Sequence, residues 1–272
     1  MKTRIIISML FVFASLAIVA QTKGNGNVVS DQRNVDNFTS IKLTSSADIY
    51  ITQGKKSVTV KTDENIQEFI KTTVDDGVLN IGVKGKGFRS VKVLEVYISV
   101  PTLEKVISSG SGDIEFDGVY KANDLYFRLN GSGDLEGDFN TANMELKVNG
   151  SGDSEISGVM GSFRVTVVGS GDIVAEGLKL EECYVMSSGS GDVSIEGKTK
   201  NLTVKQMGSG DLNASRFTAV NATVSNSGSA DININVVESL NVSLNGSGDL
   251  TYSGDPEKLR IKTNGSGEVY RR

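Results

Sequence analysis

A four-residue motif, Gly-Ser-Gly-Asp, recurs along this chain at a nearly constant spacing. Nine copies, two of them variants, end in acidic residues that follow one another at intervals of 18 to 21 residues. A fixed period of this length is typical of repeat proteins, in which each unit packs mainly against its neighbours. The first glycines of the copies are Gly110, Gly131, Gly150, Gly169, Gly189, Gly208, Gly228, Gly246 and Gly265.

Apolar residues alternate with polar ones on both sides of each motif. Met144, Leu146 and Val148 precede one copy, and this period of two indicates a strand with one buried face. A second glycine commonly follows the motif, as at Gly158 and Gly177. Each unit is therefore predicted to run as a strand, a glycine corner, a second strand and a turn.

The repeat decides the fold class. Two short strands in about 19 residues cannot bury their own apolar face, but stacked copies can pair in parallel with the next unit. We predict an all-β fold, a right-handed parallel β-helix (β-solenoid) with coils of 19–20 residues, because parallel crossovers strongly favour that hand. The competing arrangement is a meander of antiparallel hairpins. A meander would not need the same corner in every unit, and the two-residue hairpin turns that it favours are mostly missing.

The residues of the motif suit a sharp structural corner. Glycine allows a positive φ and a close approach of two backbones. Ser and Asp side chains can hydrogen-bond to backbone amides that the corner leaves unpaired. Asparagines before four of the motifs are expected to stack as an amide ladder, and they are Asn130, Asn149, Asn245 and Asn264.

Three parts of the chain follow from these patterns. Residues 1–20 are predicted to be a signal peptide, 21–105 an irregular N-terminal cap with the first degenerate coil, and 106–272 the regular solenoid. Residues 28–272 then form one continuous domain. A degenerate motif, Ser46-Ala47-Asp48, stands 65 residues before Asp113. Between the two, strands are predicted near 58–60, 78–83 and 91–100, with a short helix near 64–70.

The start of the chain has the pattern of a secretory signal. Lys2 and Arg4 precede an almost wholly apolar stretch, Ile5–Val19, that is shorter than the roughly 20 residues of a membrane span. An uncleaved N-terminal anchor is the alternative. Removal of residues 1–20 would take away two positive charges and change the net charge from −5 to −7. We expect export to the periplasm, the cell surface or the medium, with no transmembrane segment after cleavage.

The composition argues against several familiar chemistries. The chain has no His and a single Cys, Cys183, which removes Ser-His-Asp and Cys-His pairs, His-ligated zinc and an intrachain disulfide. A lone thiol is more often a small buried apolar residue than a nucleophile. A mildly acidic chain without a run of Lys or Arg is a poor candidate for binding nucleic acid or anionic lipid. We predict no catalytic residue and no cofactor.

In-register stacking would bring the acidic residues of the motifs into one column. Like charges about 5 Å apart repel by roughly 1 kcal/mol at the dielectric of water, and backbone hydrogen bonds and water at each corner would offset this. The alternative is Ca²⁺, which favours carboxylate and carbonyl oxygens. Its ligands would come from Asp113, Asp134, Asp153, Asp172, Asp192, Asp211, Asp231 and Asp249, with Glu268 at the end of the column.

Several segments together resemble one bacterial family. The Phe38–Ile41 opening, the Ser46–Ile49 segment, Val100–Glu104 running into Ser109–Asp113, and the later Gly-Ser-Gly-Asp coils are similar to the "putative auto-transporter adhesin, head GIN domain" family, common in Bacteroidetes. The resemblance covers about 28–272. It implies a β-helix with no established enzymatic activity and no known catalytic residues.

These observations lead to one functional expectation with two alternatives. We expect a non-enzymatic exported solenoid that acts as an adhesin, or as an interaction or structural protein of the cell envelope. Its partner would be a glycan or a protein of the envelope or of a host surface. The alternatives are a calcium-binding solenoid and a polysaccharide-active β-helix enzyme with two catalytic carboxylates. The regularity of the repeat argues against the enzyme, because long loops normally build a cleft.

Overall fold

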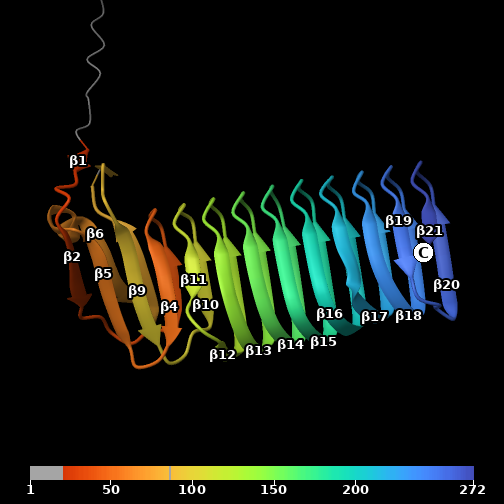
Figure 1. Ribbon diagram of the computed structural model, residues 1–272, viewed down its shortest axis with the longest axis horizontal. Helices are drawn as coiled ribbons and strands as arrows, with labels where there is room; N and C mark the ends of the chain where they lie inside the picture. The colour runs from red at the N-terminus through yellow and green to blue at the C-terminus, as the bar shows by residue number, and fades with distance from the viewer. Residues whose placement is uncertain (1–20, 86) are drawn as a thin grey trace, which may run out of the picture.

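The structure is a computed structural model that describes residues 21–85 and 87–272 (Figure 1). The described part contains 21 strands and one short 3₁₀ helix. The predicted signal peptide, residues 1–20, lies outside the described residues. Over the described ranges, no helix is long and apolar enough to cross a membrane.

Most of the chain forms a β-solenoid of about nine turns, which confirms the fold class predicted from the repeat. Figure 1 shows the coils side by side along the long axis of the molecule. Equivalent residues of successive coils pair in parallel; Leu146, for example, pairs with Phe127 and Val165. The strands of the coils are β3 (Ser40–Leu43), β4 (Asp48–Gln53), β10 (Lys105–Ser108), β11 (Ile114–Phe116), β12 (Tyr120–Leu129), β13 (Leu135–Val148), β14 (Ser154–Val167), β15 (Ile173–Ser187), β16 (Val193–Gln206), β17 (Leu212–Asn226), β18 (Ile232–Leu244), β19 (Leu250–Ser253), β20 (Lys258–Thr263) and β21 (Val269–Arg271).

The turn predicted in the middle of each coil is wrong for most of the solenoid. Strands β13–β18 each run for 13 to 15 residues from one motif to the next. Instead of leaving the sheet, the strand bends, and its pairing shifts register, as between Ser157 and Ser162. Gly158 and Gly177 have φ of +82° and +64° at these bends, a conformation that favours glycine.

Each coil encloses the core between two walls. One wall follows the motif and includes Phe116 in β11, and the other precedes the next motif and includes Phe127 in β12. Both side chains are buried, and their ring centroids lie 5.8 Å apart. The inward side chains of the two walls thus pack against each other. Since side chains alternate along a strand, the outward side chains of the two walls lie on opposite sides of the solenoid.

The motif glycines are required for close stacking. A Cβ atom on Gly131 would lie 1.6 Å from the carbonyl oxygen of Gly110 in the preceding coil. That same carbonyl accepts a hydrogen bond from the N–H of Ser132 at 3.3 Å. The corners are therefore hydrogen-bonded to each other so closely that a side chain at this position does not fit. Of the two reasons predicted for glycine, close approach applies at the corner, and both apply at Gly158 in the mid-coil bend, where a Cβ atom would lie 1.8 Å from the carbonyl oxygen of Phe139.

The other polar residues of the corner behave partly as predicted. Asn149 Nδ2 donates to Asn130 Oδ1 at 2.9 Å, and Asn264 Nδ2 donates to Asn245 Oδ1 at 2.9 Å, so the amide ladder forms as two separate pairs. The motif serines are exposed, and at Ser132 the backbone N–H makes the contact between coils by donating to the carbonyl oxygen of Gly110.

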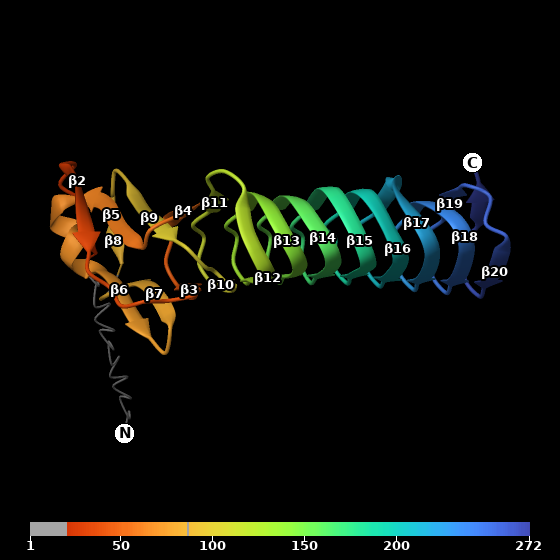
Figure 2. The ribbon, with the colours of Figure 1, turned by 90° about the horizontal axis from the view of Figure 1, so that it is seen from below.

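Antiparallel strands cover the N-terminal end of the solenoid (Figure 2). Two of these cap strands continue the coils, because they pair in parallel with β3 and β4. The strands predicted near 58–60, 78–83 and 91–100 are present, and the predicted helix is a 3₁₀ helix. The elements are β1 (Thr22–Lys23), β2 (Val28–Arg33), β5 (Ser57–Asp63), η1 (Glu64–Phe69), β6 (Ile70–Asp75), β7 (Val78–Val83), β8 (Phe88–Arg89) and β9 (Leu94–Val100).

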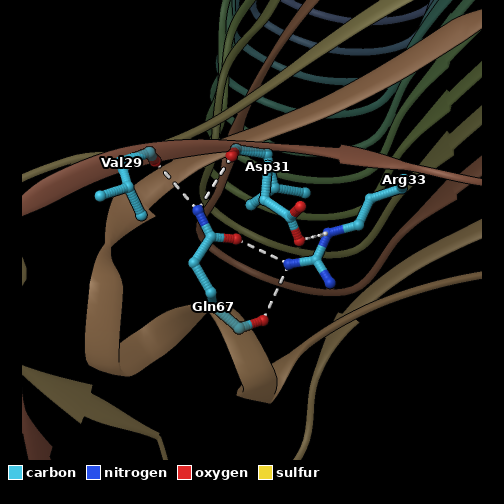
Figure 3. Close-up of polar contacts among 5 residues, drawn as sticks. Val29, Asp31, Arg33 and Gln67 are labelled. Atoms are coloured by element: carbon cyan, nitrogen blue, oxygen red, sulfur yellow. Dashed lines mark hydrogen bonds and ion pairs between the residues drawn. The ribbon is translucent and has the colours of Figure 1, made fainter.

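Gln67 fastens η1 to the antiparallel strands of the cap (Figure 3). Its side-chain Nε2 donates to the carbonyl oxygens of Val29 in β2 and Val60 in β5, each at 3.0 Å. Arg33 donates through Nη2 to the backbone and side-chain oxygens of Gln67 at 2.9 and 2.6 Å. Asp31 lies 3.3 Å from Arg33 Nε. These bonds join three elements of the cap.

The part of the cap from β5 to β9 is an insertion between the first two coils, whereas β1 and β2 precede the first coil. Strands β3 and β4 pair in register with β10 and β11, 65 residues later in the chain. Ser45 and Ala47 stand where the later coils have glycine. On the cap side, β8 lies between β7 and β9 in the chain, where the later coils have a short Gly-Ser-Gly corner. With no tight corner stacked against them from that side, residues 45 and 47 can carry side chains.

Replacement of Gly152 by Ala should destabilise the solenoid by about 1–3 kcal/mol or more. The new methyl group would meet the carbonyl oxygen of Gly133 at 2.1 Å and force two backbones apart. Gly54→Ala is the matched control, since its methyl group would meet only the rotatable side chain of Ser99. Thermal unfolding followed by circular dichroism measures both variants. Equal melting temperatures would contradict the stacking argument.

Replacement of Ser154 by Val should stabilise the solenoid by about 1–2 kcal/mol. Ser154 is fully buried, its hydroxyl has no hydrogen-bond partner, and it pairs with the apolar Leu135 and Ile173 of the adjoining coils. Removal of an unsatisfied buried hydroxyl recovers its desolvation cost. Ser194→Val, at an outward position, should change the free energy of unfolding by less than about 0.5 kcal/mol. The same unfolding measurement tests both, and a less stable Ser154→Val would contradict the prediction.

Candidate functional site

The acidic residues of the motifs form one hydrogen-bonded column, with Asp48 of the degenerate motif as its first member. In each coil, the backbone N–H of the acidic residue donates to a carboxylate oxygen one coil earlier, at 2.7–3.0 Å. Asp153, for example, donates to Asp134 Oδ1 at 2.7 Å and accepts from Asp172 N–H at 2.8 Å. This acidic ladder ends at Glu268.

The ladder explains how a column of like charges is stable. A hydrogen bond to a charged group contributes about 1.5–3 kcal/mol, which exceeds the roughly 1 kcal/mol of repulsion between neighbours at the dielectric of water. In the described residues, no group of three or more His, Cys, Asp or Glu side chains is placed to hold a metal ion. The carboxylates of the ladder thus have a structural role that requires no bound cation.

The wall that follows each motif carries further carboxylates beside the ladder. Each coil here has a glutamate two residues after its ladder carboxylate, and these glutamates pair in register from coil to coil. They are Glu115, Glu136 and Glu155. A hollow of about 420 Å³ lies among them. We call this surface the acidic face, and its outward residues beyond the ladder are Glu115, Asp117, Glu136, Asp138, Glu155, Glu176 and Glu196.

On the opposite wall, the charged outward side chains are mainly cations, and uncharged residues such as Thr203, Thr223 and Asn241 lie among them. Its outward positions lie five and three residues before the first glycine of each motif, and parallel pairing arranges them in two columns. Among the described residues of these two columns, Glu145 alone is acidic. We call this surface the basic face, and it comprises Lys42, Lys105, Tyr126, Arg128, Lys147, Arg164, Tyr184, Lys205, Arg260 and Lys262.

Each tyrosine of the basic face lies between two cations. The Nζ atoms of Lys105 and Lys147 are 5.4 and 5.2 Å from the ring centroid of Tyr126. The guanidinium carbon of Arg164 and Nζ of Lys205 are 4.2 and 5.8 Å from that of Tyr184. Cation–π attraction of about 0.5–1 kcal/mol at exposed sites helps to hold such side chains in place. The two clusters are three coils apart, about 14 Å at roughly 4.8 Å per coil.

One cation of the first cluster also has a carboxylate partner. Glu145 Oε1 lies 2.7 Å from Lys147 Nζ. The hydrogen bond from this ammonium to Glu145 raises the pKa of Lys147, so the side chain stays charged at neutral pH. Lys147 therefore contributes a positive charge to the first cluster at neutral pH.

A groove of about 530 Å³ adjoins Tyr126 where the cap meets the solenoid. Asp124, Asn143, Ser162 and Arg164 also line it. Asn143 Nδ2 donates to Asp124 Oδ1 at 2.7 Å, and Asn143 Oδ1 accepts from Ser162 Oγ at 2.7 Å. The hydrogen bond from Asn143 lowers the pKa of Asp124. The groove thus presents amide, hydroxyl and ionised carboxylate groups side by side.

The single thiol is buried in the core, as expected. Cys183 is 2% exposed, and burial raises its pKa to about 12. Since the thiolate is the reactive form, Cys183 is a packing residue at neutral pH.

The sequence led to the acidic ladder and the corner glycines but missed the two charged faces. The structure brings every predicted ladder residue into one column. The cations of the basic face are dispersed between Lys42 and Lys262, and no run of Lys or Arg marks them. The available signal was the position of each residue relative to its motif, because residues at equal offsets stack on the same face.

The stacked coils define a β-solenoid protein with columns of charged residues on both lateral walls. The family model described as "Putative auto-transporter adhesin, head GIN domain" matches residues 37–196 and 185–256. The chain therefore belongs to that family, as its sequence resemblance implied. No curated protein matches it.

Solved structures from Parabacteroides species share the fold. A "putative lipid binding protein" and a "putative adhesin", both from Parabacteroides distasonis, have TM-scores of 0.66 and 0.67 at 23% and 22% identity. Each comparison covers 93% of this chain and 100% of the other. A "putative adhesin" from Parabacteroides merdae has a TM-score of 0.64 at 21% identity, with 93% and 99% covered. At these identities the similarity concerns the fold alone.

Two replacements of Asp153 in the acidic ladder should separate the effect of its hydrogen bond on stability from the effect of its charge. Asp153→Ala removes the acceptor for Asp172 N–H and should destabilise the solenoid by about 1–3 kcal/mol. Asp153→Asn keeps an acceptor oxygen and removes one repelling charge, so its stability should equal or slightly exceed that of the parent at low salt. Thermal unfolding with and without millimolar Ca²⁺ measures both. An Asn variant as unstable as the Ala variant, or a Ca²⁺-induced rise in melting temperature that Asn abolishes, would favour the calcium alternative.

Proposed function

We propose that this protein is an exported, non-enzymatic adhesin that binds a cell-envelope or host surface through a lateral face of its solenoid. The observation that carries the proposal is the basic face, where Tyr126 and Tyr184 each lie between two cations on one wall. An extended face of this kind offers many weak contacts in a row, which suits a long or repetitive surface ligand. The family description, an adhesin, agrees with this role.

The carboxylates with shifted pKa values support binding over hydrolysis. A general acid for glycosidic bonds needs a raised pKa. The pKa of Asp124 in the groove is lowered by its hydrogen bond from Asn143. The pKa of Glu95 is lowered by hydrogen bonds from Tyr97 and Lys61. Both carboxylates stay ionised, and ionised carboxylates accept hydrogen bonds from the hydroxyl groups of a bound ligand.

Export is part of the proposal and rests on the N-terminal sequence. Lys2, Arg4 and the apolar Ile5–Val19 stretch have the pattern of a secretory signal. A protein that acts outside the cytoplasm can present its lateral faces to an envelope or to another cell. The solved structure named as a lipid binding protein makes lipid the competing class of ligand.

Labelled protein of residues 21–272 should bind saturably to intact cells or isolated envelopes, and 0.5 M salt should weaken the binding at least several-fold, because it screens exposed charges. Protein unfolded by heat is the control. Protease treatment of intact producing cells should remove the protein if it lies on the cell surface, whereas protection would place it in the periplasm. No saturable binding to any envelope, or turnover of a polysaccharide that Asp→Asn changes abolish, would overturn the proposal.

A further inference from the structure

The basic face is cationic in a chain whose net charge is −5. Its charges come from coils far apart in the sequence and are brought to one wall by the parallel register. Arg128, Lys147 and Lys205 lie in the column three residues before the motif, and Lys105 and Arg164 lie in the column five residues before it. Such a row of like charges, with a single carboxylate among them, attracts a polyanion.

We infer that the basic face binds an acidic polysaccharide that lies along the solenoid axis. This inference rests on the proposed adhesin function and names its ligand. A polymer with an anionic group in each repeat matches the cations of the successive coils from Lys42 to Arg164, which recur at a spacing of roughly 4.8 Å. The clusters around Tyr126 and Tyr184, about 14 Å apart by that spacing, hold two separate anionic groups of one chain.

The groove beside Tyr126 favours a carbohydrate over other polyanions. Asp124, Asn143 and Ser162 supply carboxylate, amide and hydroxyl groups next to the first cationic cluster. Sugar rings carry many hydroxyl groups, which donate to carboxylates and both donate to and accept from amides. A ligand with both anionic groups and hydroxyl groups therefore fits the cations of the face and the polar groove together.

The basic face fits an anionic membrane less well than it fits an acidic polysaccharide. The exposed apolar side chains at the edge of this wall, Val168 and Met207, are 46% and 48% exposed. Ser188 lies between them in the stacked order, so they form no continuous apolar patch. Membrane binding through an amphipathic surface draws on buried apolar area as well as on charge. The basic face supplies the charge but little of the apolar area.

The test compares two variants with the same change in net charge. The face variant replaces Lys105, Arg128, Arg164 and Lys205 by Gln. The control variant replaces four exposed cations outside the basic face by Gln, namely Lys179, Lys198, Lys200 and Arg216. Binding to polygalacturonate and dextran sulfate is measured by titration, with neutral dextran for comparison and circular dichroism to confirm folding. We expect the face variant to lose at least tenfold in affinity and to show a weaker salt dependence, and the control variant to lose less than threefold.

Several outcomes would overturn the inference. They are equal losses in both variants, no binding of either acidic polymer, equal binding of neutral dextran, and tighter binding to vesicles of anionic lipid than to the polysaccharides. Sedimentation in the absence of polymer shows whether the acidic face of a second copy is the polyanion instead, and salt-sensitive dimers lost only in the face variant would favour that partner. If the protein binds envelopes but neither acidic polymer, the proposed ligand class is wrong and the adhesin proposal still stands.

Discussion

The hydrogen bond between stacked corners is the constraint on which the rest of this structure depends. The carbonyl of one motif glycine accepts from the serine N–H of the next coil, and this contact leaves no room for a side chain at the glycine above it. The corner therefore fixes the distance between coils and the register of the strands on either side. Every column of side chains in the solenoid, buried or exposed, follows from that register.

Because the register is fixed, residues at the same offset from the motif form a column along the solenoid. A carboxylate at one offset from the motif becomes a column of carboxylates, which is stable because each one accepts a hydrogen bond from the next coil. A short polar side chain at a core offset is left without a partner at Ser154, whereas the longer Asn226 donates to the carbonyl oxygen of Ala230. Outward offsets carry no such structural demand, so charged residues gather there into the acidic and basic faces.

The parts of the fold that depend on the repeat could be predicted from the sequence, and the parts that depend on long-range pairing could not. Alternating residues and recurring Gly-Ser-Gly-Asp motifs predict parallel coils and the acidic column. The mid-coil glycines read equally well as turns or as bends, because a positive φ at Gly158 is compatible with both. The antiparallel arrangement of β2, β5 and β9 has no local signal, since its partners lie 25 to 42 residues apart. The basic face was hidden because its cations are adjacent only after stacking.

Regular and irregular positions of the repeat therefore carry different kinds of information. The ladder position is acidic in every coil, and each carboxylate there up to Asp249 accepts a hydrogen bond from the backbone of the next coil. The outward columns of the basic face change from coil to coil: Tyr126 is followed by Glu145, Arg164 and Tyr184 in the same column. Stacking does not require this order, because these side chains point away from the core. A pattern that the fold does not impose is where selection for a ligand can act, and in this protein that pattern is the arrangement of tyrosines and cations on the basic face.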